Sequence, residues 1–181
     1  MQDVLKHRPF RADLNQAWRP IQQCLPGPDA FWRDWLLESG SLTRRLQAVS
    51  DDTFQVRVLA EGWIRGSSHQ MQLLGSHRPG HWLWSRHVEL CLYGKAWVAA
   101  HSLIPYNSMR GHLRQLSRLR DKPLGGFLFE QPDLSRQPPE ITRSSECWGR
   151  RSLFSLQQRP LLVAEFFLPE MRYHLVNMEI Q

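Results

Sequence analysis

The first clear pattern of apolar positions is helical and begins near residue 29. Four large apolar side chains fall on one face of a helix, at Phe31, Trp32, Trp35 and Leu36. Gly40 can end this helix in a left-handed conformation, and Ser41 is placed to cap a second helix directly after it. The pattern therefore predicts two helices joined by a very short link, preceded by a polar, loosely ordered lead-in over residues 1–28.

The pattern then changes from helical spacing to alternation, which is typical of strands. In residues 54–63, 81–92 and 96–105, apolar side chains recur at every second position and so fall on one face of a strand. Tyr93-Gly94-Lys95 separates the last two segments and is suited to a tight turn. Because such short turns join neighbouring strands, these segments predict an antiparallel sheet.

The second half of the chain repeats the order of helices followed by strands. Residues 106–131 have helical spacing that is broken at Pro123 and at Gly125-Gly126, which predicts a second short helical hairpin. A polar, proline-bearing segment follows, and the tail from Glu170 shows no clear pattern. Further strands are predicted around Ile141, at 151–156 and at 161–169. The expected fold class is α+β, with a single antiparallel sheet of about six strands flanked by helices.

Two charged residues interrupt the apolar rows of these strands. Arg86 lies in the middle of a strand face in HWLWSRHVELCL, and Glu165 is surrounded by apolar neighbours on both faces of LLVAEFFLP. A buried charge is costly unless an opposite charge or a ligand stabilises it. One interpretation is that Arg86 and Glu165 pair with each other. The other is that both line a pocket, where arginine suits a carboxylate and glutamate suits a hydroxyl group or proton transfer.

Length and composition place the chain among single-domain globular proteins. It has 181 residues, 41% of them hydrophobic, so we expect one domain over 1–181 with one sizeable core. No apolar run approaches the roughly 20 residues of a membrane-spanning helix, and the start lacks the pattern of a signal peptide. The three cysteines are far apart and form no CxxC pair. We therefore expect a cytoplasmic protein with reduced thiols and no stable membrane insertion.

Charge and short motifs exclude several classes of function. The net charge of +6 suits an anionic ligand or a nucleic acid, but no run of Lys and Arg is longer than two residues. No metal-ligand spacing, phosphate-binding loop or GxSxG motif is present, so we expect no metal and no cofactor. His101 alternates with apolar residues on its strand, where a hydrogen-bonded structural role is more common than a catalytic one.

Five segments in the same order resemble the chorismate pyruvate-lyase family, also called chorismate lyase. They are DWLLESGSLTRRL (34–46), the WLWSRHVELC strand with its return to SLIP, KPLGGFLF (122–129), ECWGRRSLFSL (146–156) and PLLVAEFFLP (160–169). The resemblance covers about residues 29–170. It implies a cofactor-free monomeric enzyme that converts chorismate into 4-hydroxybenzoate and pyruvate for ubiquinone synthesis. It also implies an antiparallel sheet with two helical flaps that close over a buried ligand.

The resemblance also suggests site residues. Arg86 matches the family's arginine for the ring carboxylate, and Glu165 matches its glutamate near the 4-hydroxyl end. Leu42 matches a first-flap residue that is more usually methionine and that binds through its backbone N–H, and Leu124 matches the leucine of the second flap. His101 stands where the family has a strand arginine, so the role of that position is open.

Three other functions remain open from the sequence. A sensor or carrier of an aromatic acid could use the same fold, because effector domains of one class of bacterial transcription regulators resemble it. A chorismatase-type enzyme that gives another hydroxybenzoate is the nearest enzymatic rival. A nucleic-acid-binding protein would fit the positive charge, yet the tryptophans alternate with aliphatic residues as core residues do. We therefore expect a small-molecule ligand and no nucleic-acid partner.

Overall fold

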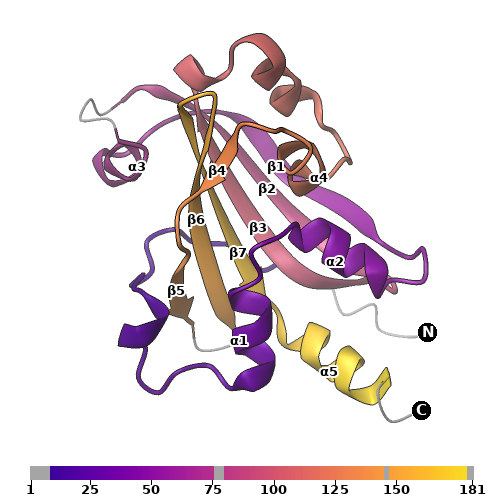
Figure 1. The fold of residues 1–181 in the computed structure, drawn as a ribbon. Coiled ribbons are helices and arrows are strands. Elements are labelled where there is room, and N and C mark those ends of the chain that lie inside the picture. The colour runs from indigo at the N-terminus through magenta and orange to yellow at the C-terminus, as the bar shows by residue number, and fades with distance from the viewer. Residues whose placement is uncertain (1–8, 76–79, 145–146, 179–181) are drawn as a thin grey trace, which may run out of the picture.

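The protein is built on one open antiparallel sheet, as the alternating segments predict. A computed structural model describes residues 9–75, 80–144 and 147–178. The described residues form a seven-stranded sheet in the order β1-β2-β3-β7-β6-β4, and β5 also pairs with β6 (Figure 1). The strands are β1 (Gln55–Arg65), β2 (Trp82–Leu92), β3 (Lys95–Pro105), β4 (Leu134–Arg136), β5 (Glu140–Arg143), β6 (Trp148–Leu156) and β7 (Arg159–Phe167). The predicted α+β class is confirmed, with one strand more than expected.

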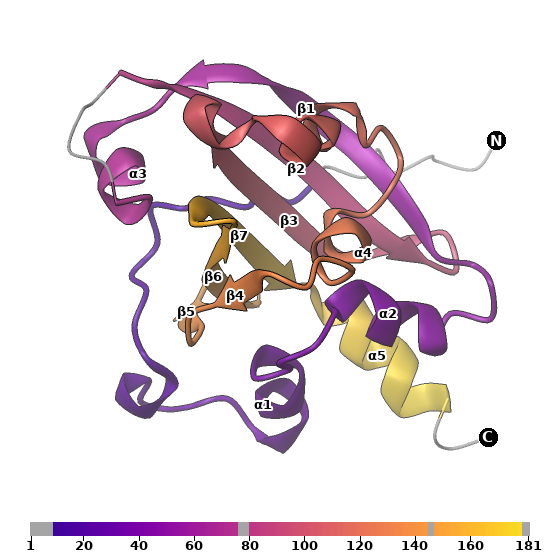
Figure 2. The same ribbon diagram turned by 45° about the horizontal axis from the view of Figure 1, so that its top comes forward.

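Short helices connect the strands and cover the sheet. The α-helices are α1 (Ala30–Leu36), α2 (Leu42–Ala48), α3 (Ser68–Leu73), α4 (Leu124–Leu128) and α5 (Pro169–Met178). Three 3-10 helices are η1 (Ile21–Gln23), η2 (Tyr106–Ser108) and η3 (Gly111–Arg118). The helical segment predicted at 106–131 is therefore mostly 3-10 helix. Figures 1 and 2 show α2 and α4 over the same face of the sheet. The sequence patterns had no counterpart for α3, α5, β4 and the short η1.

The first two helices begin where the sequence predicts. The Asp29 side chain accepts a hydrogen bond from Trp32 N, and the Ser41 side chain accepts one from Arg44 N. α1 ends at Leu36, so the link to α2 is longer than the pattern suggested. This link lies against the sheet, because Trp35, Leu36 and Leu42 are buried in the same cluster as β3 and β7 residues.

Residues 9–28 of the lead-in are better anchored to the sheet than the sequence suggested. Residues 9–28 contain little regular structure, yet Ala12 and Leu14 are buried against the sheet face opposite the flaps. Phe10 and Trp18 both contact the ring of Phe166 on β7, with ring centroids 5.3 and 5.6 Å away. Phe10, Ala12 and Leu14 alternate with exposed residues, so their side chains anchor a segment that forms no regular strand. Residues 1–8 of the predicted lead-in lie outside the described residues.

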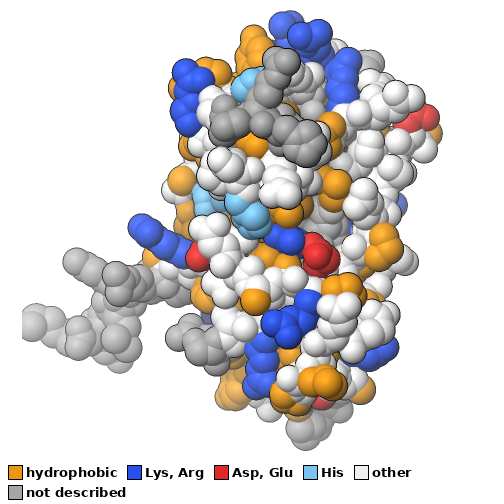
Figure 3. All heavy atoms as spheres, turned by 90° about the vertical axis from the view of Figure 1, so that its left-hand side faces the viewer, with side chains coloured by type: hydrophobic (Ala, Val, Ile, Leu, Met, Phe, Trp, Pro, Cys, Tyr) orange, Lys and Arg blue, Asp and Glu red, His pale blue; other side chains and the backbone are white. Residues whose placement is uncertain are grey.

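Basic side chains do not form one continuous patch on the face that Figure 3 shows. On the face seen in Figure 3, Lys and Arg lie in small groups separated by polar and apolar side chains. A protein that follows a nucleic-acid backbone instead concentrates such charges along one surface. Within 9–75, 80–144 and 147–178, no helix is long and apolar enough to cross a membrane.

Candidate functional site

A small, partly enclosed cavity lies between the sheet and the two flap helices, α2 and α4. Its volume is about 40 Å³, enough for about three water molecules. Its wall includes Leu42, Arg86, Leu124, Arg136, Arg150 and Glu165. All four residues that the sequence nominated therefore meet at this cavity. Because the volume is so small, a ring-sized ligand requires the flaps to shift before it can enter.

The flaps touch each other directly above the cavity. A Cβ atom on Gly125 of α4 would lie 2.8 Å from the Thr43 Oγ1 atom of α2, closer than real Cβ contacts allow. Glycine therefore permits the N-terminal ends of the two helices to meet. Leu42 and Leu124 are both buried beside this contact and form the apolar roof of the cavity.

Arg86 enters the cavity from β2 and is 3% exposed. Its Nη2 atom donates hydrogen bonds to the carbonyl oxygens of Arg120 and Lys122, at 2.5 and 3.0 Å. Both carbonyls belong to the segment that leads into α4, so Arg86 also supports the second flap. Burial lowers the pKa of Arg86, and the charge of Glu61 partly offsets that effect.

A β-bulge explains why Glu61 is the carboxylate next to Arg86. The pairing of β1 with β2 shifts between Val58 and Ala60, so Glu61 lies opposite Arg86. Its carboxylate is 3.3 Å from Arg86 Nε. Strict alternation places Glu61 on the same face as Arg57, but the extra residue of a bulge reverses the faces beyond it.

Glu165 has a different partner, so the interpretation in which Arg86 and Glu165 pair with each other is wrong. Arg150 of β6 lies opposite Glu165 in the β6–β7 pairing, and its Nε atom donates to the Glu165 carboxylate at 2.6 Å. The Glu165 side chain is 16% exposed, so it is less buried than the alternation suggested. Arg86 and Glu165 both line the cavity, but they lie on separate parts of its wall, because β3 separates their strands.

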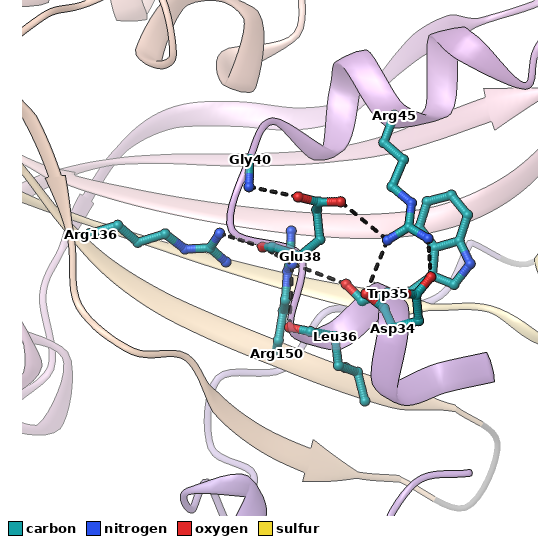
Figure 4. A network of polar contacts seen from close by, with 8 residues as sticks. All are labelled: Asp34, Trp35, Leu36, Glu38, Gly40, Arg45, Arg136 and Arg150. Carbon is teal, nitrogen blue, oxygen red and sulfur yellow. Dashed lines mark hydrogen bonds and ion pairs between the residues drawn. The ribbon is translucent and has the colours of Figure 1, made fainter. Parts of the chain in front are cut away.

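Sequence patterns missed two arginines, Arg136 and Arg150. Both donate to the backbone carbonyl of Glu38, at 2.8 and 3.0 Å, and Arg150 also donates to the carbonyls of Trp35 and Leu36. Figure 4 shows these bonds converging on the link between α1 and α2. Arg150 could have been found by extending the alternation of the predicted strand at 151–156 toward the N-terminus, through the residues WGRRS. Arg136 lies on a strand too short to show a period.

The cavity wall carries an excess of positive charge. Arg86, Arg136 and Arg150 line it with the carboxylate of Glu165. The Glu61 carboxylate lies 3.3 Å from Arg86 Nε, so the three arginines exceed the two nearby carboxylates by one positive charge. Each arginine also holds backbone carbonyls that support a flap. A largely buried cavity of this charge favours an anionic ligand and holds it by charge-assisted hydrogen bonds.

His101 lies outside this cavity, on the opposite face of the sheet. Its Nε2 atom is 2.9 Å from Ser85 Oγ, and its ring stacks on His87 with centroids 3.7 Å apart. Burial lowers its pKa to about 3, helped by the neighbouring His87 and opposed by a hydrogen bond to the backbone of Ala12. His101 is therefore a buried neutral residue beneath the N-terminal segment.

The depressed pKa of His101 predicts a loss of stability in mild acid. Between the unfolded pKa near 6.5 and the folded value of about 3, the unfolded chain binds one more proton at this residue. The free energy of unfolding should therefore fall by about 2 kcal/mol between pH 7 and pH 5 because of His101 alone. Urea unfolding of the wild type and of His101→Gln at both pH values measures this difference. Parallel pH dependences in the two proteins would contradict it.

Comparison with known proteins agrees with this geometry. The sequence model of the chorismate lyase family matches residues 14–177. A probable chorismate pyruvate-lyase 2 from Pseudomonas fluorescens (strain Pf0-1) is 37% identical over 84% of this chain and 88% of the relative. The chorismate pyruvate-lyase of Escherichia coli (strain K12) is 33% identical over 83% of this chain and 92% of the relative.

Solved structures share the fold at low sequence identity. The effector domain of PhnF from Mycobacterium smegmatis superposes with a TM-score of 0.52, is 11% identical, and covers 74% of this chain and 91% of its own. That likeness concerns the fold alone. The family match spans nearly the whole chain and includes both flaps, the charged cavity and the sheet beneath it, so the resemblance seen in the sequence is confirmed: the chain belongs to the chorismate lyase family.

Proposed function

We propose that this protein is a chorismate pyruvate-lyase, which eliminates pyruvate from chorismate and leaves 4-hydroxybenzoate. The observation that carries the proposal is the cavity in which three arginines and one glutamate lie beneath two touching helices. Chorismate is a dianion with a ring carboxylate, an enolpyruvyl ether at C3 and a hydroxyl group at C4. Its charge complements the surplus of positive charge on the cavity wall.

The reaction requires positioning more than strong chemical assistance. Breaking the bond between C3 and the ether oxygen, with loss of the hydrogen at C4, makes the ring aromatic, so the overall step is strongly favourable. The departing enolpyruvate takes up a proton and becomes pyruvate. Arg86 and backbone N–H groups of the flaps near Leu42 and Leu124 would hold the ring carboxylate, which aligns the ether for elimination. Glu165 would accept a hydrogen bond from the C4 hydroxyl group or move a proton.

The same proposal includes where the enzyme works and in what state. By resemblance to the family, it would act as a monomer in the cytoplasm, without a cofactor, and supply 4-hydroxybenzoate for ubiquinone synthesis. Its partners would be the small-molecule substrate and product. The scattered basic groups on the face in Figure 3 support the exclusion of nucleic acid.

The direct test is to mix the purified protein with chorismate and quantify both products. Chromatography identifies the aromatic acid, and coupled NADH oxidation measures pyruvate. Equal amounts of 4-hydroxybenzoate and pyruvate are the expected result. A different hydroxybenzoate would indicate a chorismatase-type reaction. Tight binding of 4-hydroxybenzoate without turnover would indicate a sensor or carrier, a role consistent with the fold shared with an effector domain.

Product release is expected to limit turnover. A cavity of about 40 Å³ beneath touching flaps is too small for the planar product, so the flaps must move to admit and release it. The first turnover should therefore be about fivefold or more faster than the steady state. Rapid-quench measurement of 4-hydroxybenzoate, with enzyme and chorismate at comparable concentrations, detects such a burst. Equal first-turnover and steady-state rates would rule it out.

A further inference from the structure

Arg136 is held in the cavity by two neutral partners. It is the last residue of β4. Its Nε atom donates a hydrogen bond to Ser152 Oγ at 3.0 Å. Its Nη1 atom donates to the carbonyl of Glu38 at 2.8 Å, and Figure 4 shows this bond. Its Nη2 atom is buried and has no hydrogen-bond partner among the described residues. A guanidinium group with an unused buried N–H edge is unfavourable unless a ligand accepts from it.

The carboxylates near Arg136 accept hydrogen bonds from other groups. Glu165 accepts from Arg150, and the Glu38 carboxylate accepts from Gly40 N and Arg45 Nη1. No ion pair of Arg136 is present within the described parts of the chain. Burial and the charge of Arg150 lower the pKa of Arg136 to about 10, so the group is still charged at neutral pH. Its charge is therefore available to an anion that enters the cavity.

The order of the strands places Arg136 and Arg86 on opposite sides of Glu165. Along the sheet, Arg86 on β2 and Arg136 on β4 are separated by β3, β7 and β6, and Glu165 on β7 lies between them. Around the chorismate ring, the hydroxyl at C4 is opposite the carboxylate at C1, and the enolpyruvyl group at C3 is next to that hydroxyl. A substrate with its ring carboxylate at Arg86 and its hydroxyl at Glu165 would therefore extend its second carboxylate toward β4.

We propose that Arg136 binds the second, ether-linked carboxylate of the substrate. This assignment rests on the proposed function, which supplies the identity of the dianion. When the ether bond breaks, the second carboxylate departs with pyruvate. The aromatic product then keeps its contact with Arg86 and has no group for Arg136.

The test compares two stable ligands that differ by one carboxylate. 4-Hydroxybenzoate carries the ring carboxylate alone, and 3-(carboxymethoxy)-4-hydroxybenzoate adds a second carboxylate on an ether at C3. Isothermal titration gives the Kd of both ligands for wild type, Arg136→Gln and Arg136→Lys. Arg136→Gln should weaken the dianion about tenfold or more and change the affinity for 4-hydroxybenzoate less than about threefold. Arg136→Lys keeps the charge without the planar fork and should give an intermediate loss.

A matched control is available on the other face of the sheet. Arg151 is also buried, also has a nitrogen atom without a hydrogen-bond partner, and lies next to Arg150 on β6, but it does not line the cavity. Arg151→Gln should leave the preference for the dianion unchanged. If Arg136→Gln does not fold, the Arg136→Lys protein still decides the question, because it should lose dianion affinity about threefold or more with little change for 4-hydroxybenzoate.

Two results would overturn the assignment. One is an equal loss for both ligands in the Arg136 variants, and the other is no loss for either ligand. These binding measurements are independent of turnover. A wild type that binds the dianion through Arg136 but does not convert chorismate would refute the proposed lyase function while retaining the role of Arg136.

Discussion

Arg86→Ala is expected to lower kcat/KM for chorismate about 30- to 900-fold, which corresponds to about 2 to 4 kcal/mol. Arg86 is buried in the cavity wall, where a charge-assisted bond to the ring carboxylate is poorly replaced by water. The affinity for 4-hydroxybenzoate should fall by a similar factor, because substrate and product share that carboxylate. Steady-state kinetics and isothermal titration measure the two quantities. Wild-type constants in the variant would remove Arg86 from the site.

A control must separate binding from support of the second flap. Arg86 also holds the carbonyls of Arg120 and Lys122, so its loss alters the base of α4 as well as the charge of the cavity. Arg159 on β7 offers a matched substitution, because its Nη1 atom donates to the carbonyl of Arg110 at 3.1 Å outside the cavity. Arg159→Ala should keep kcat/KM within about twofold, as expected for a half-buried arginine outside the cavity. Equal losses in both variants would indicate a general effect on the fold.

Strand alternation predicted the rows that build the cavity. In β2 it placed Arg86 on the same face as Val88 and Leu90, and all three line the cavity. In β7 it placed Glu165 with Val163, which also lines the cavity. These segments pair on both sides with other strands, so their side chains keep the regular period of a central strand. Periodicity is informative where the pairing is regular.

The partners of the charged residues could not be predicted in this way. Glu61 reaches Arg86 only because a bulge reverses the faces of β1, and a bulge depends on the strand beside it. Arg136 lies in a three-residue strand within the proline-bearing segment, too short to show any alternation. α5 buries Met171 but also exposes Tyr173, Val176 and Met178, so its apolar residues do not gather on one face and give no amphipathic signal. Each of these features is determined by tertiary contacts.

The Glu165 carboxylate is expected to matter more for turnover than for product binding. Glu165→Gln removes the group that can accept a proton, and it leaves Arg150 without its anionic partner in the cavity wall. The value of kcat/KM for chorismate should fall about 100-fold or more, the usual contribution of a positioned acid or base. The affinity for 4-hydroxybenzoate should fall much less, because its ring carboxylate is bound at Arg86. Steady-state kinetics and titration of the same preparation give both values.

The neighbouring strand positions provide the control for this ion pair. Arg151 Nε donates to the Glu140 carboxylate at 2.7 Å, one residue along β6 from the Arg150–Glu165 pair, and neither residue lines the cavity. Glu140→Gln removes a similar interaction from the same sheet and should leave kcat/KM within about twofold. If Glu140→Gln and Glu165→Gln lost activity equally, the effect would belong to the stability of the sheet. A large loss in Glu165→Gln alone would assign the carboxylate to the reaction, because the two substitutions remove the same charge and differ in access to the cavity.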